Sequence, residues 1–307
     1  MKNKVLVTGG AGFIGSHIVD RLIEEECKVV VLDNLSKGRL ENLNNEADFE
    51  RIDISNNQFT NLIKKIKPDI VFHLAAQSSI ARSIKNPKRD IEVNLLATQD
   101  LLDVAKEAKV KKLIFASSAA VYAESKKLPL DEENIKEPIS LYGVSKLCSE
   151  YLLRNYHKIH KLSYASLRFA NVYGSRQDMS SEGGVVAIFI DKILKSSKAT
   201  IFGDGTQTRD FVYVSDVVDA CLSSLKDNVF GEFNIGTEEE TSIVNLYKKL
   251  LGLTGVKDNR KFEKRKILEV KRSSLSSEKF RDICGWKPKV DLDQGLKLTF
   301  DYFQKKR

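Results

Sequence analysis

Two residues in the middle of the chain have the types and spacing for acid–base chemistry on a hydroxyl group. Tyr142 and Lys146 lie four apart in Tyr-Gly-Val-Ser-Lys, so on a helix both would face one ligand. A nearby ammonium favours phenolate and lowers the pKa of a tyrosine towards neutrality, as a general base requires. The same pair is also common on exposed helices, so the spacing alone does not decide its role.

Ser118 lies upstream of this pair, directly after a predicted strand, in Ser-Ser-Ala-Ala-Val-Tyr. Doubly wound sheets bind their ligands at the carboxyl ends of strands, where a serine hydroxyl can hydrogen-bond a reacting oxygen. A plain turn would also contain serines. The presence of Ser118, Tyr142 and Lys146 together favours an enzyme over a non-catalytic NAD-sensing or nucleic-acid-binding protein.

A glycine-rich turn near the N-terminus predicts a dinucleotide site. Residues 8–15 read Thr-Gly-Gly-Ala-Gly-Phe-Ile-Gly and join a short strand to a helix. The glycines let the backbone approach a pyrophosphate at the helix N-terminus. Asp33 ends the second strand, where its carboxylate can bind the adenosine ribose and would repel a 2′-phosphate. NAD is therefore favoured over NADP, although Lys37 and Arg39 have the charge to hold that phosphate.

The elements that must position these residues alternate between strands and helices. Runs of β-branched residues predict buried parallel strands at 5–7, 29–32, 70–74, 113–116 and 164–167. Amphipathic segments predict helices at 14–25, about 89–108 and about 141–159. The alternation predicts an α/β fold with a Rossmann-like, doubly wound parallel sheet.

The pattern becomes less regular after residue 170, with glycine-rich turns and shorter elements. We expect residues 1–170 to form an NAD-binding Rossmann domain. Residues 171–307 should form a smaller C-terminal substrate-binding α/β lobe. A strand followed by a helix begins again at 211, so about 211–235 is expected to return to the first domain.

Composition is that of an ordinary globular protein. The chain has 307 residues, 42% hydrophobic and 30% charged, and no apolar run approaches the roughly 18 residues that cross a bilayer. It starts with a strand rather than a signal peptide, so we expect a cytoplasmic protein without membrane association. The four cysteines lack the spacing of a zinc site or disulfide framework, so no metal is expected.

The formal net charge of +8 fits a nucleic acid, an anionic small substrate or a lysine-rich surface. Much of the excess comes from residues 248–272, which hold ten Lys or Arg and three acids. Most such runs are solvated surface. With the motifs above, we expect no nucleic-acid partner.

Together the motifs resemble the extended short-chain dehydrogenases of the NAD-dependent nucleotide-sugar epimerase and dehydratase family, and among them the UDP-sugar 4-epimerases. The resemblance covers nearly the whole chain. Further segments that carry it are His73-Leu74-Ala75-Ala76-Gln77, Arg168-Phe169-Ala170-Asn171-Val172-Tyr173-Gly174, Phe202-Gly203-Asp204-Gly205, Arg209-Asp210-Phe211 and Gly285-Trp286-Lys287-Pro288.

The resemblance implies an NAD site in which Asp53 and Ile54 flank the adenine and Lys146 also holds the nicotinamide ribose. His73 is expected to be structural. The full set of cofactor-binding residues that it implies is Gly9, Gly12, Phe13, Ile14, Gly15, Asp33, Asn34, Ser36, Gly38, Asp53, Ile54, Leu74, Ala75, Ala76, Gln77, Asn94, Tyr142 and Lys146.

On the substrate side, the resemblance implies that Asn171 and Arg209 hold a UDP diphosphate, for which an arginine fork is well suited. Val185 and Phe202 would line the nucleobase pocket. The substrate-binding set that it implies is Ser118, Asn171, Val185, Phe202, Arg209, Lys266 and Ser273.

The chain departs from the family at four positions. Lys266 and Leu268 stand where relatives usually carry Arg and Gly, Ser276 replaces an Asp, and Ala123 replaces a Gly. These changes leave the catalytic group intact but affect the expected nucleotide contacts.

The resemblance also implies the reaction. Family members oxidise sugar C4 to a ketone, and dehydratases and decarboxylases then use an acid just after the Ser or Thr. Here those positions are Ala119 and Ala120. Return of the hydride to the opposite face then interconverts UDP-glucose with UDP-galactose, or UDP-GlcNAc with UDP-GalNAc. A dehydratase, decarboxylase or reductase of the same family is the alternative.

Two further expectations follow from the resemblance. Ser273 matches a position whose bulk decides whether an N-acetyl group fits at C2, so N-acetylhexosamines should be accepted. Family members commonly pair the helices near 89–108 and 141–159, so we expect a homodimer.

Overall fold

The computed structural model describes residues 3–180, 183–264 and 270–306. Lys266 and Leu268 therefore lie outside the described residues. The strands are β1 (Lys4–Thr8), β2 (Lys28–Asp33), β3 (Asp48–Arg51), β4 (Ile70–His73), β5 (Lys112–Ser118), β6 (Tyr164–Phe169), β7 (Asn171–Tyr173), β8 (Ala199–Phe202), β9 (Thr208–Arg209), β10 (Phe211–Tyr213), β11 (Gly231–Ile235), β12 (Thr241–Ser242) and β13 (Arg260–Glu263).

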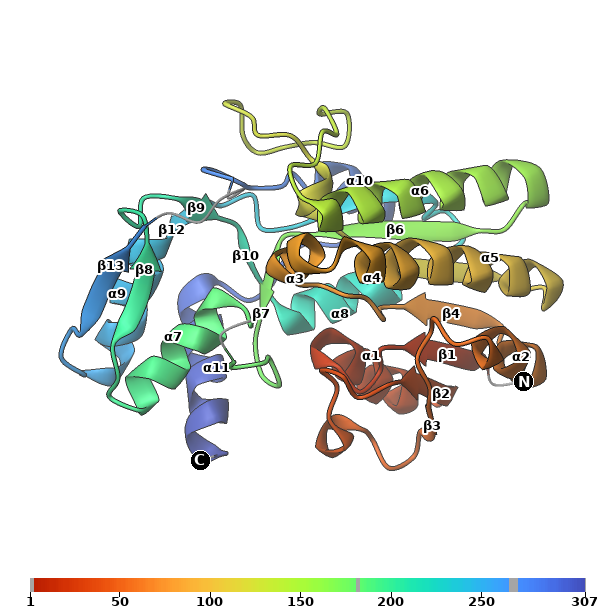
Figure 1. The fold of residues 1–307 in the computed structure, drawn as a ribbon, viewed down its shortest axis with the longest axis horizontal. Helices are drawn as coiled ribbons and strands as arrows, with labels where there is room; N and C mark the ends of the chain where they lie inside the picture. The colour runs from red at the N-terminus through yellow and green to blue at the C-terminus, as the bar shows by residue number, and fades with distance from the viewer. Residues whose placement is uncertain (1–2, 181–182, 265–269, 307) are drawn as a thin grey trace.

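The helices lie between these strands (Figure 1). The α-helices are α1 (Phe13–Glu24), α2 (Gln58–Ile66), α3 (Ile80–Lys85), α4 (Pro87–Ile91), α5 (Ala97–Glu107), α6 (Leu141–His160), α7 (Val185–Leu194), α8 (Val214–Ser223), α9 (Ile243–Thr254), α10 (Glu278–Cys284) and α11 (Leu292–Lys305). Short turns of other helix types are η1 (Leu40–Asn42), η2 (Glu92–Leu96) and η3 (Ala119–Val121).

In the part of the chain that is described, one seven-stranded sheet has the order β11-β6-β5-β4-β1-β2-β3. All of its neighbouring strands are parallel. This is the strand order of a Rossmann fold with one more strand beside β6. The expected α/β doubly wound sheet is confirmed, and the five predicted strands are its β1, β2, β4, β5 and β6.

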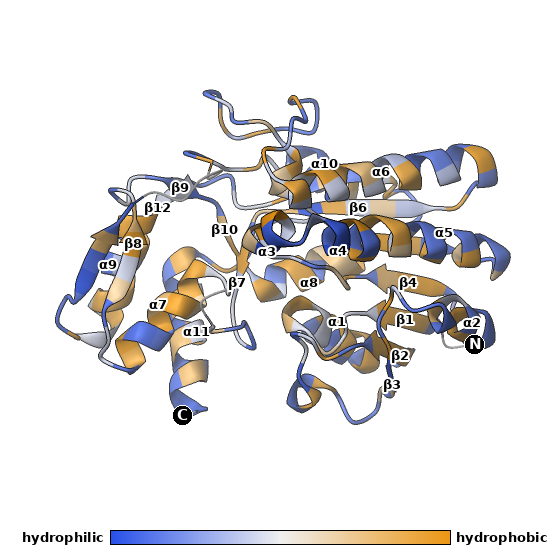
Figure 2. Cartoon of the chain, viewed as in Figure 1, coloured by the Kyte–Doolittle hydropathy of each residue, from blue (hydrophilic) through white to orange (hydrophobic). Residues whose placement is uncertain are grey.

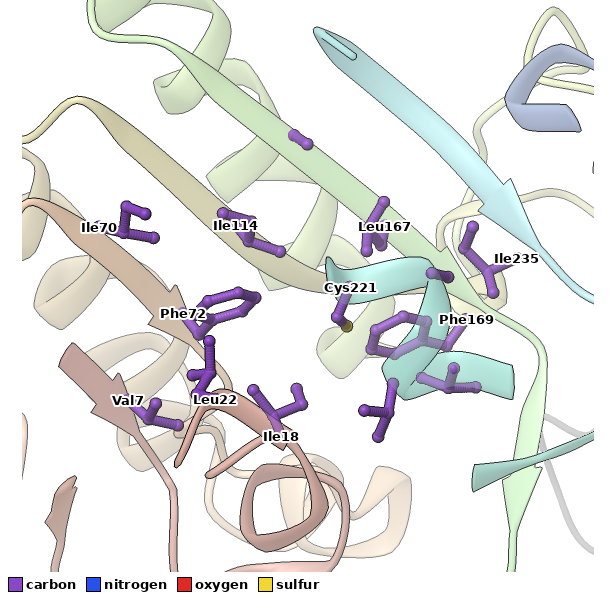
Figure 3. Packing of buried hydrophobic residues seen from close by; sticks show 14 of the residues in the cluster. Val7, Ile18, Leu22, Ile70, Phe72, Ile114, Leu167, Phe169, Cys221 and Ile235 are labelled. Atoms are coloured by element: carbon purple, nitrogen blue, oxygen red, sulfur yellow. The ribbon is translucent and has the colours of Figure 1, made fainter. Parts of the chain in front are cut away.

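Both faces of the sheet are covered by apolar packing. On one face, side chains of α1 and α8 such as Ile18 and Cys221 join Val7 and Phe72 of the strands in one apolar cluster (Figure 3). Phe280 of α10 belongs to the same cluster and contacts the Phe233 ring. On the other face, α2, α5 and α6 pack against a second apolar cluster. Burial on both faces explains why β1 and β4 are coloured mostly hydrophobic (Figure 2).

A third apolar cluster lies between α7, α9 and α11, on the opposite side of the molecule from β1–β3 (Figure 1). The strands β8 and β13 pair beside it. In contrast, β11 pairs with β6 in the large sheet, and α8 packs against α1. The division of the chain at residue 170 stays a prediction.

Candidate functional site

The glycine-rich turn keeps space open at the N-terminus of α1. Gly9 has φ +74°, and a Cβ there would lie 2.7 Å from the Ala75 nitrogen. A Cβ on Gly15 would overlap the Gly9 carbonyl oxygen. Gly12 is the N-cap of α1, and the helix continues through Phe13 and Ile14. Only glycine fits these close approaches, and the turn suits a pyrophosphate at the helix N-terminus.

Asp33 lies at the carboxyl end of β2, buried against this turn. Its carboxylate accepts hydrogen bonds from the backbone nitrogens of Ala11 (3.1 Å) and Leu35 (2.8 Å). Burial raises the pKa of Asp33, and these two hydrogen bonds oppose the shift. A Cβ on Gly38 would lie 2.8 Å from both carboxylate oxygens. The surroundings of Asp33 therefore leave room for a ribose hydroxyl only if residue 38 is small.

Asp53 is tied to the second strand through Asn34, whose amide donates to it at 2.8 Å, and Asn34 in turn accepts from the Ser36 nitrogen. Arg89 of α4 also contacts Asp53, at 2.5 Å. Burial by itself would raise the pKa of Asp53, but Ser55, Asn34 and Arg89 together lower it to about 2. Arg89 was not predicted as a site residue, because its contact spans 36 positions of the chain.

Residues 74–77 leave β4 and meet Asn94. The Gln77 nitrogen donates to the Asn94 side chain at 2.8 Å, and the Asn94 amide donates back to the Gln77 carbonyl at 3.0 Å. Asn94 lies in η2, a π-helical turn within the helix expected at 89–108. Its carbonyl accepts from Thr98 and Ser149 side chains. Such turns often mark functional sites.

His73 is fully enclosed beside this segment. Its ring nitrogens contact Thr8 Oγ1 at 2.7 Å and Thr98 Oγ1 at 3.1 Å. Burial, with a smaller effect of Lys146, lowers the pKa of His73 to about 3. The ring is therefore neutral at physiological pH and links β1, β4 and α5.

Ser118 and Tyr142 meet because the N-terminus of α6 packs on the turn after β5. Ser140 caps α6 by accepting from the Gly143 nitrogen at 3.1 Å. A Cβ on Gly143 would overlap the Ala120 carbonyl oxygen, so glycine allows this close approach. The Ser118 side chain lies beside the Tyr142 phenol and acts to lower its pKa. Two of the three expected catalytic residues thus lie next to each other.

Lys146 lies one turn further along α6 and is 2% exposed. Its ammonium donates to the Ala116 carbonyl at 2.9 Å and lies 4.6 Å from the centroid of the Phe115 ring. Burial lowers the pKa of Lys146 to about 8, although Asp90 and Glu150 act to raise it. The ammonium is 5.9 Å from the centroid of the Tyr142 ring, so the pair shares one face as expected.

The expected low pKa of Tyr142 is not found. Burial raises the pKa of Tyr142 to about 12, Ser118 opposes the shift, and Asp90 adds to it. The Lys146 ammonium is bonded to the strand carbonyl rather than to the phenol. Desolvation of the phenolate therefore outweighs any effect of the lysine in the protein alone.

A buried ion pair that sequence reasoning missed supports the catalytic residues. The Arg168 guanidinium donates to both carboxylate oxygens of Glu150, at 2.7 Å to Oε2 and 3.0 Å to Oε1. The same carboxylate accepts from Ser117 at 2.6 Å, and Arg168 also donates to Tyr122. This network fixes α6 to the ends of β5 and β6. Glu150 looks like any other polar helix residue in the sequence.

The expected diphosphate residues lie near one another. The Asn171 nitrogen donates to the Asp210 carbonyl at 2.8 Å, next to Arg209. Arg209 lies in β9, which pairs with β12. Phe202 ends β8, and Gln207 donates to its carbonyl at 2.8 Å. Val185 begins α7, a separate element.

A cavity of about 310 Å³ lies beside Phe202. Its lining residues are Gly203, Asp204, Thr206, Gln207 and Lys271. The roles of Asn171, Val185, Phe202 and Arg209 stay predictions.

Ser273 lies in a segment that is anchored at several points. The Thr208 nitrogen donates to the Lys271 carbonyl at 3.0 Å, and the Leu130 nitrogen donates to the Ser274 carbonyl at 2.8 Å. The buried Asp210 carboxylate accepts from the Leu275 nitrogen at 3.1 Å. Ser273 is half-buried between these anchors.

The family model described as the NAD dependent epimerase/dehydratase family matches residues 5–236. The chain belongs to this family. It is an enzyme, and its cofactor is NAD, as the turn at Gly9 and the carboxylate of Asp33 led us to expect.

Relatives and solved structures agree with this assignment. The UDP-glucose 4-epimerase of Mycolicibacterium smegmatis is 39% identical over 310 residues, covering 99% of each chain. The crystal structure of a UDP-glucose 4-epimerase from Thermotoga maritima with UDP-glucose gives a TM-score of 0.96 at 43% identity, covering 99% of each chain. The structure of a UDP-N-acetylglucosamine 4-epimerase from Methanobrevibacter ruminantium, in complex with UDP-N-acetylmuramic acid, gives a TM-score of 0.94 at 35% identity, covering 100% of each chain.

Proposed function

We propose that this family member is a UDP-sugar 4-epimerase that interconverts UDP-glucose with UDP-galactose, UDP-GlcNAc with UDP-GalNAc, or both. The proposal rests on the position of Ser118 beside Tyr142, with Lys146 one helical turn away on the same face of α6. In addition, the two residues after Ser118 are Ala119 and Ala120, which have only methyl side chains. The group can move a hydroxyl proton, while the two alanines supply no acid for elimination or decarboxylation. The similarity to two kinds of UDP-sugar 4-epimerase supports the same reaction.

In this proposal each residue has a distinct task. Tyr142 takes the proton of the C4 hydroxyl and later returns it, and Ser118 hydrogen-bonds the reacting oxygen. Lys146 holds positive charge beside the phenol. NAD, held by the turn at Gly9 and by Asp33, would supply the acceptor and donor of the C4 hydride, and its positive charge would favour the phenolate form of Tyr142. Arg209 and Asn171 hold the diphosphate.

The test is product analysis. Purified protein is incubated with UDP-glucose and UDP-GlcNAc separately, without added cofactor, and the sugar resonances are followed by NMR. The C4 epimers are expected, together with release of NAD on denaturation. A 4-keto-6-deoxy sugar would instead establish a dehydratase. A decarboxylase would leave both substrates unchanged, and it is tested with UDP-glucuronic acid, from which loss of CO2 would give a pentose.

A homodimer is the second part of the proposal. Exposed apolar side chains lie on α4, η2 and α6, including Ile91, Leu96, Val144 and Tyr151. Leu101, Leu102 and Leu147 are buried and face the core. Two copies that pair these helices would cover the exposed group. Light scattering at micromolar concentration should give twice the chain mass, and a monomer mass would contradict the dimer.

We also propose that the protein works in the cytoplasm. All four cysteines are free thiols, which suits a reducing compartment. Among the described residues, the helices are too short or too polar to span a bilayer.

A further inference from the structure

Asp90 of α4 is a buried carboxylate for which the proposed mechanism has no task. Its residue is 0% exposed. Oδ1 accepts hydrogen bonds from the side-chain amides of Gln77, at 2.8 Å, and Asn94, at 3.1 Å. Oδ2 is also buried but accepts no hydrogen bond from any residue that the structure describes. A buried carboxylate oxygen without a donor is costly, which calls for an explanation.

Asp90 is linked to the catalytic helix. The Asn94 amide that donates to Asp90 also donates to Ser145 Oγ at 3.2 Å, and Ser145 donates to the Tyr142 carbonyl at 3.0 Å. Helix α4 packs directly against α6. The carboxylate is therefore connected, through two side chains, to the turn that carries Tyr142.

The charge of Asp90 acts on both titrating catalytic groups. It raises the pKa of Lys146, as Glu150 does, and it raises the pKa of Tyr142. The two carboxylates that raise the pKa of Lys146 are Asp90 on α4 and Glu150 on α6, and Lys146 in turn lowers the pKa of His73 on β4. Glu150 is also paired with Arg168. Of the two carboxylates, Asp90 has the larger effect on the pKa of Lys146.

We propose that Asp90 is a positioning residue for the proton transfer. Its carboxylate holds Gln77 and Asn94 in place and keeps Lys146 charged beside Tyr142. It does not touch the reacting atoms. The inference rests on the proposed epimerase function for its kinetic test, but not for its spectroscopic test.

The variant Asp90→Asn removes the negative charge of residue 90 and can keep the hydrogen bonds that this residue accepts. The amide oxygen can replace Oδ1 and keep both accepted hydrogen bonds, while the NH₂ group takes the place of the unpartnered Oδ2. The variant should therefore fold, and only the negative charge is lost. Asp100→Asn makes the same charge change at an exposed position on α5 and is the matched control. Asp90→Glu keeps the charge.

The kinetic test is the pH profile of kcat/KM for UDP-glucose. Removing a negative charge lowers the pKa of both a tyrosine and a lysine. With Asp90→Asn in the NAD-loaded enzyme, both limbs of the profile should move to lower pH by about one unit. Asp90→Glu and Asp100→Asn should keep the wild-type limbs. A uniformly lower rate with both limbs unmoved would show a merely structural residue and overturn the proposal.

The spectroscopic test needs no activity. In protein labelled with ¹³C-lysine, the Lys146 resonance is identified by its loss in Lys146→Met, and its pKa is read from the titration. The pKa of Lys146 should fall in Asp90→Asn and not in Asp100→Asn; no fall would overturn the proposal. If Asp90→Asn does not fold, Asp90→Ser carries the same test. Wild-type protein that leaves UDP-glucose unchanged would refute the epimerase function, while the titration would still decide the role of Asp90.

Discussion

The cofactor side and the sugar side of the site are built in different ways. Asp33 is positioned locally, because β2 ends at this residue and its carboxylate binds the adjoining turns at Ala11 and Leu35. Arg209 and Ser273 depend instead on the buried Asp210, which gathers donors from two distant segments. Its carboxylate accepts from the Thr237, Glu238 and Leu275 nitrogens and from the Thr237 hydroxyl. The first side follows from a strand–turn–helix unit, and the second from contacts between loops.

The largest expected effect is at the junction of the two sides. Tyr142→Phe removes the proposed base and should lower kcat by roughly 10²- to 10⁴-fold, the usual range for general-base catalysis. Circular dichroism should show an intact fold, and the variant should still carry NAD. Tyr151→Phe, on the exposed surface of the same helix, is the control. Near-wild-type turnover by Tyr142→Phe would remove this residue from the mechanism.

The next effect should be confined to the sugar side. Asp210→Asn must turn an amide NH₂ towards backbone N–H donors, because both carboxylate oxygens of Asp210 accept from such groups. Each lost hydrogen bond leaves a buried donor unsatisfied, at about 1–3 kcal/mol. We expect KM for the UDP-sugar to rise by roughly 10- to 100-fold, with NAD content unchanged.

This result would separate the two sides of the site. Steady-state kinetics gives the KM, and absorbance of the released cofactor gives the NAD content. A parallel loss of NAD would show that the two sides are not independent. Asp90→Asn is a useful comparison, because one carboxylate oxygen of Asp90 accepts no hydrogen bond from the described residues. If lost hydrogen bonds cause the rise in KM of Asp210→Asn, Asp90→Asn should not show that rise.

Sequence reasoning worked where position is set by neighbours along the chain. The glycines of residues 9–15, Asp33 and the Tyr142/Lys146 pair could be placed because each belongs to one strand, turn or helix. Arg89 could not, since its contact with Asp53 spans 36 positions. Asp90 could not either, because its link to the catalytic helix runs through the bond from Asn94 to Ser145, which spans 51 positions.

The pKa of Tyr142 could not be predicted either. From the sequence, only the effect of Lys146, four residues away, could be taken into account, and it lowers the pKa of Tyr142. In the structure the pKa is raised, chiefly because the surrounding fold buries the phenol. The helix expected at 89–108 is present from Pro87 to Glu107, but its π-helical turn η2 was not predicted. Within that turn the side chains of Thr98 and Ser149 donate to the Asn94 carbonyl.

A smaller effect is expected at Ser273. A serine there leaves room for an acetamido group at C2 and offers it a hydroxyl. Ser273→Tyr should lower kcat/KM for UDP-GlcNAc about tenfold, in the range that pocket shape can discriminate, and spare UDP-glucose. Glu278→Tyr, at an exposed position of α10, is the control. Equal losses with both substrates, or no turnover of UDP-GlcNAc by the wild type, would show that Ser273 is not the gate.

The smallest expected effect is on the cofactor side, where Arg89 contributes to the free energy of unfolding through Asp53. Arg89 is one of the groups that lower the pKa of Asp53 to about 2, against about 3.9 in an unfolded chain. A depressed carboxyl pKa stabilises the fold above pH 4, and this contribution is lost as the pH falls towards 2. Because both side chains are about one-third exposed, we expect Arg89→Ala to lower the free energy of unfolding at pH 7 by only about 1 kcal/mol.

The pH dependence identifies the cause of this loss. The difference in unfolding free energy between wild type and Arg89→Ala should stay constant from pH 7 to about 5 and shrink as Asp53 becomes protonated between about pH 4 and pH 2. Urea unfolding at several pH values measures it, with Lys88→Ala, at the exposed neighbouring position, as the control. A difference that persists unchanged at pH 3 would mean that Arg89 stabilises the fold by packing rather than by its charge, and that Asp53 is held by Asn34 and Ser55 alone.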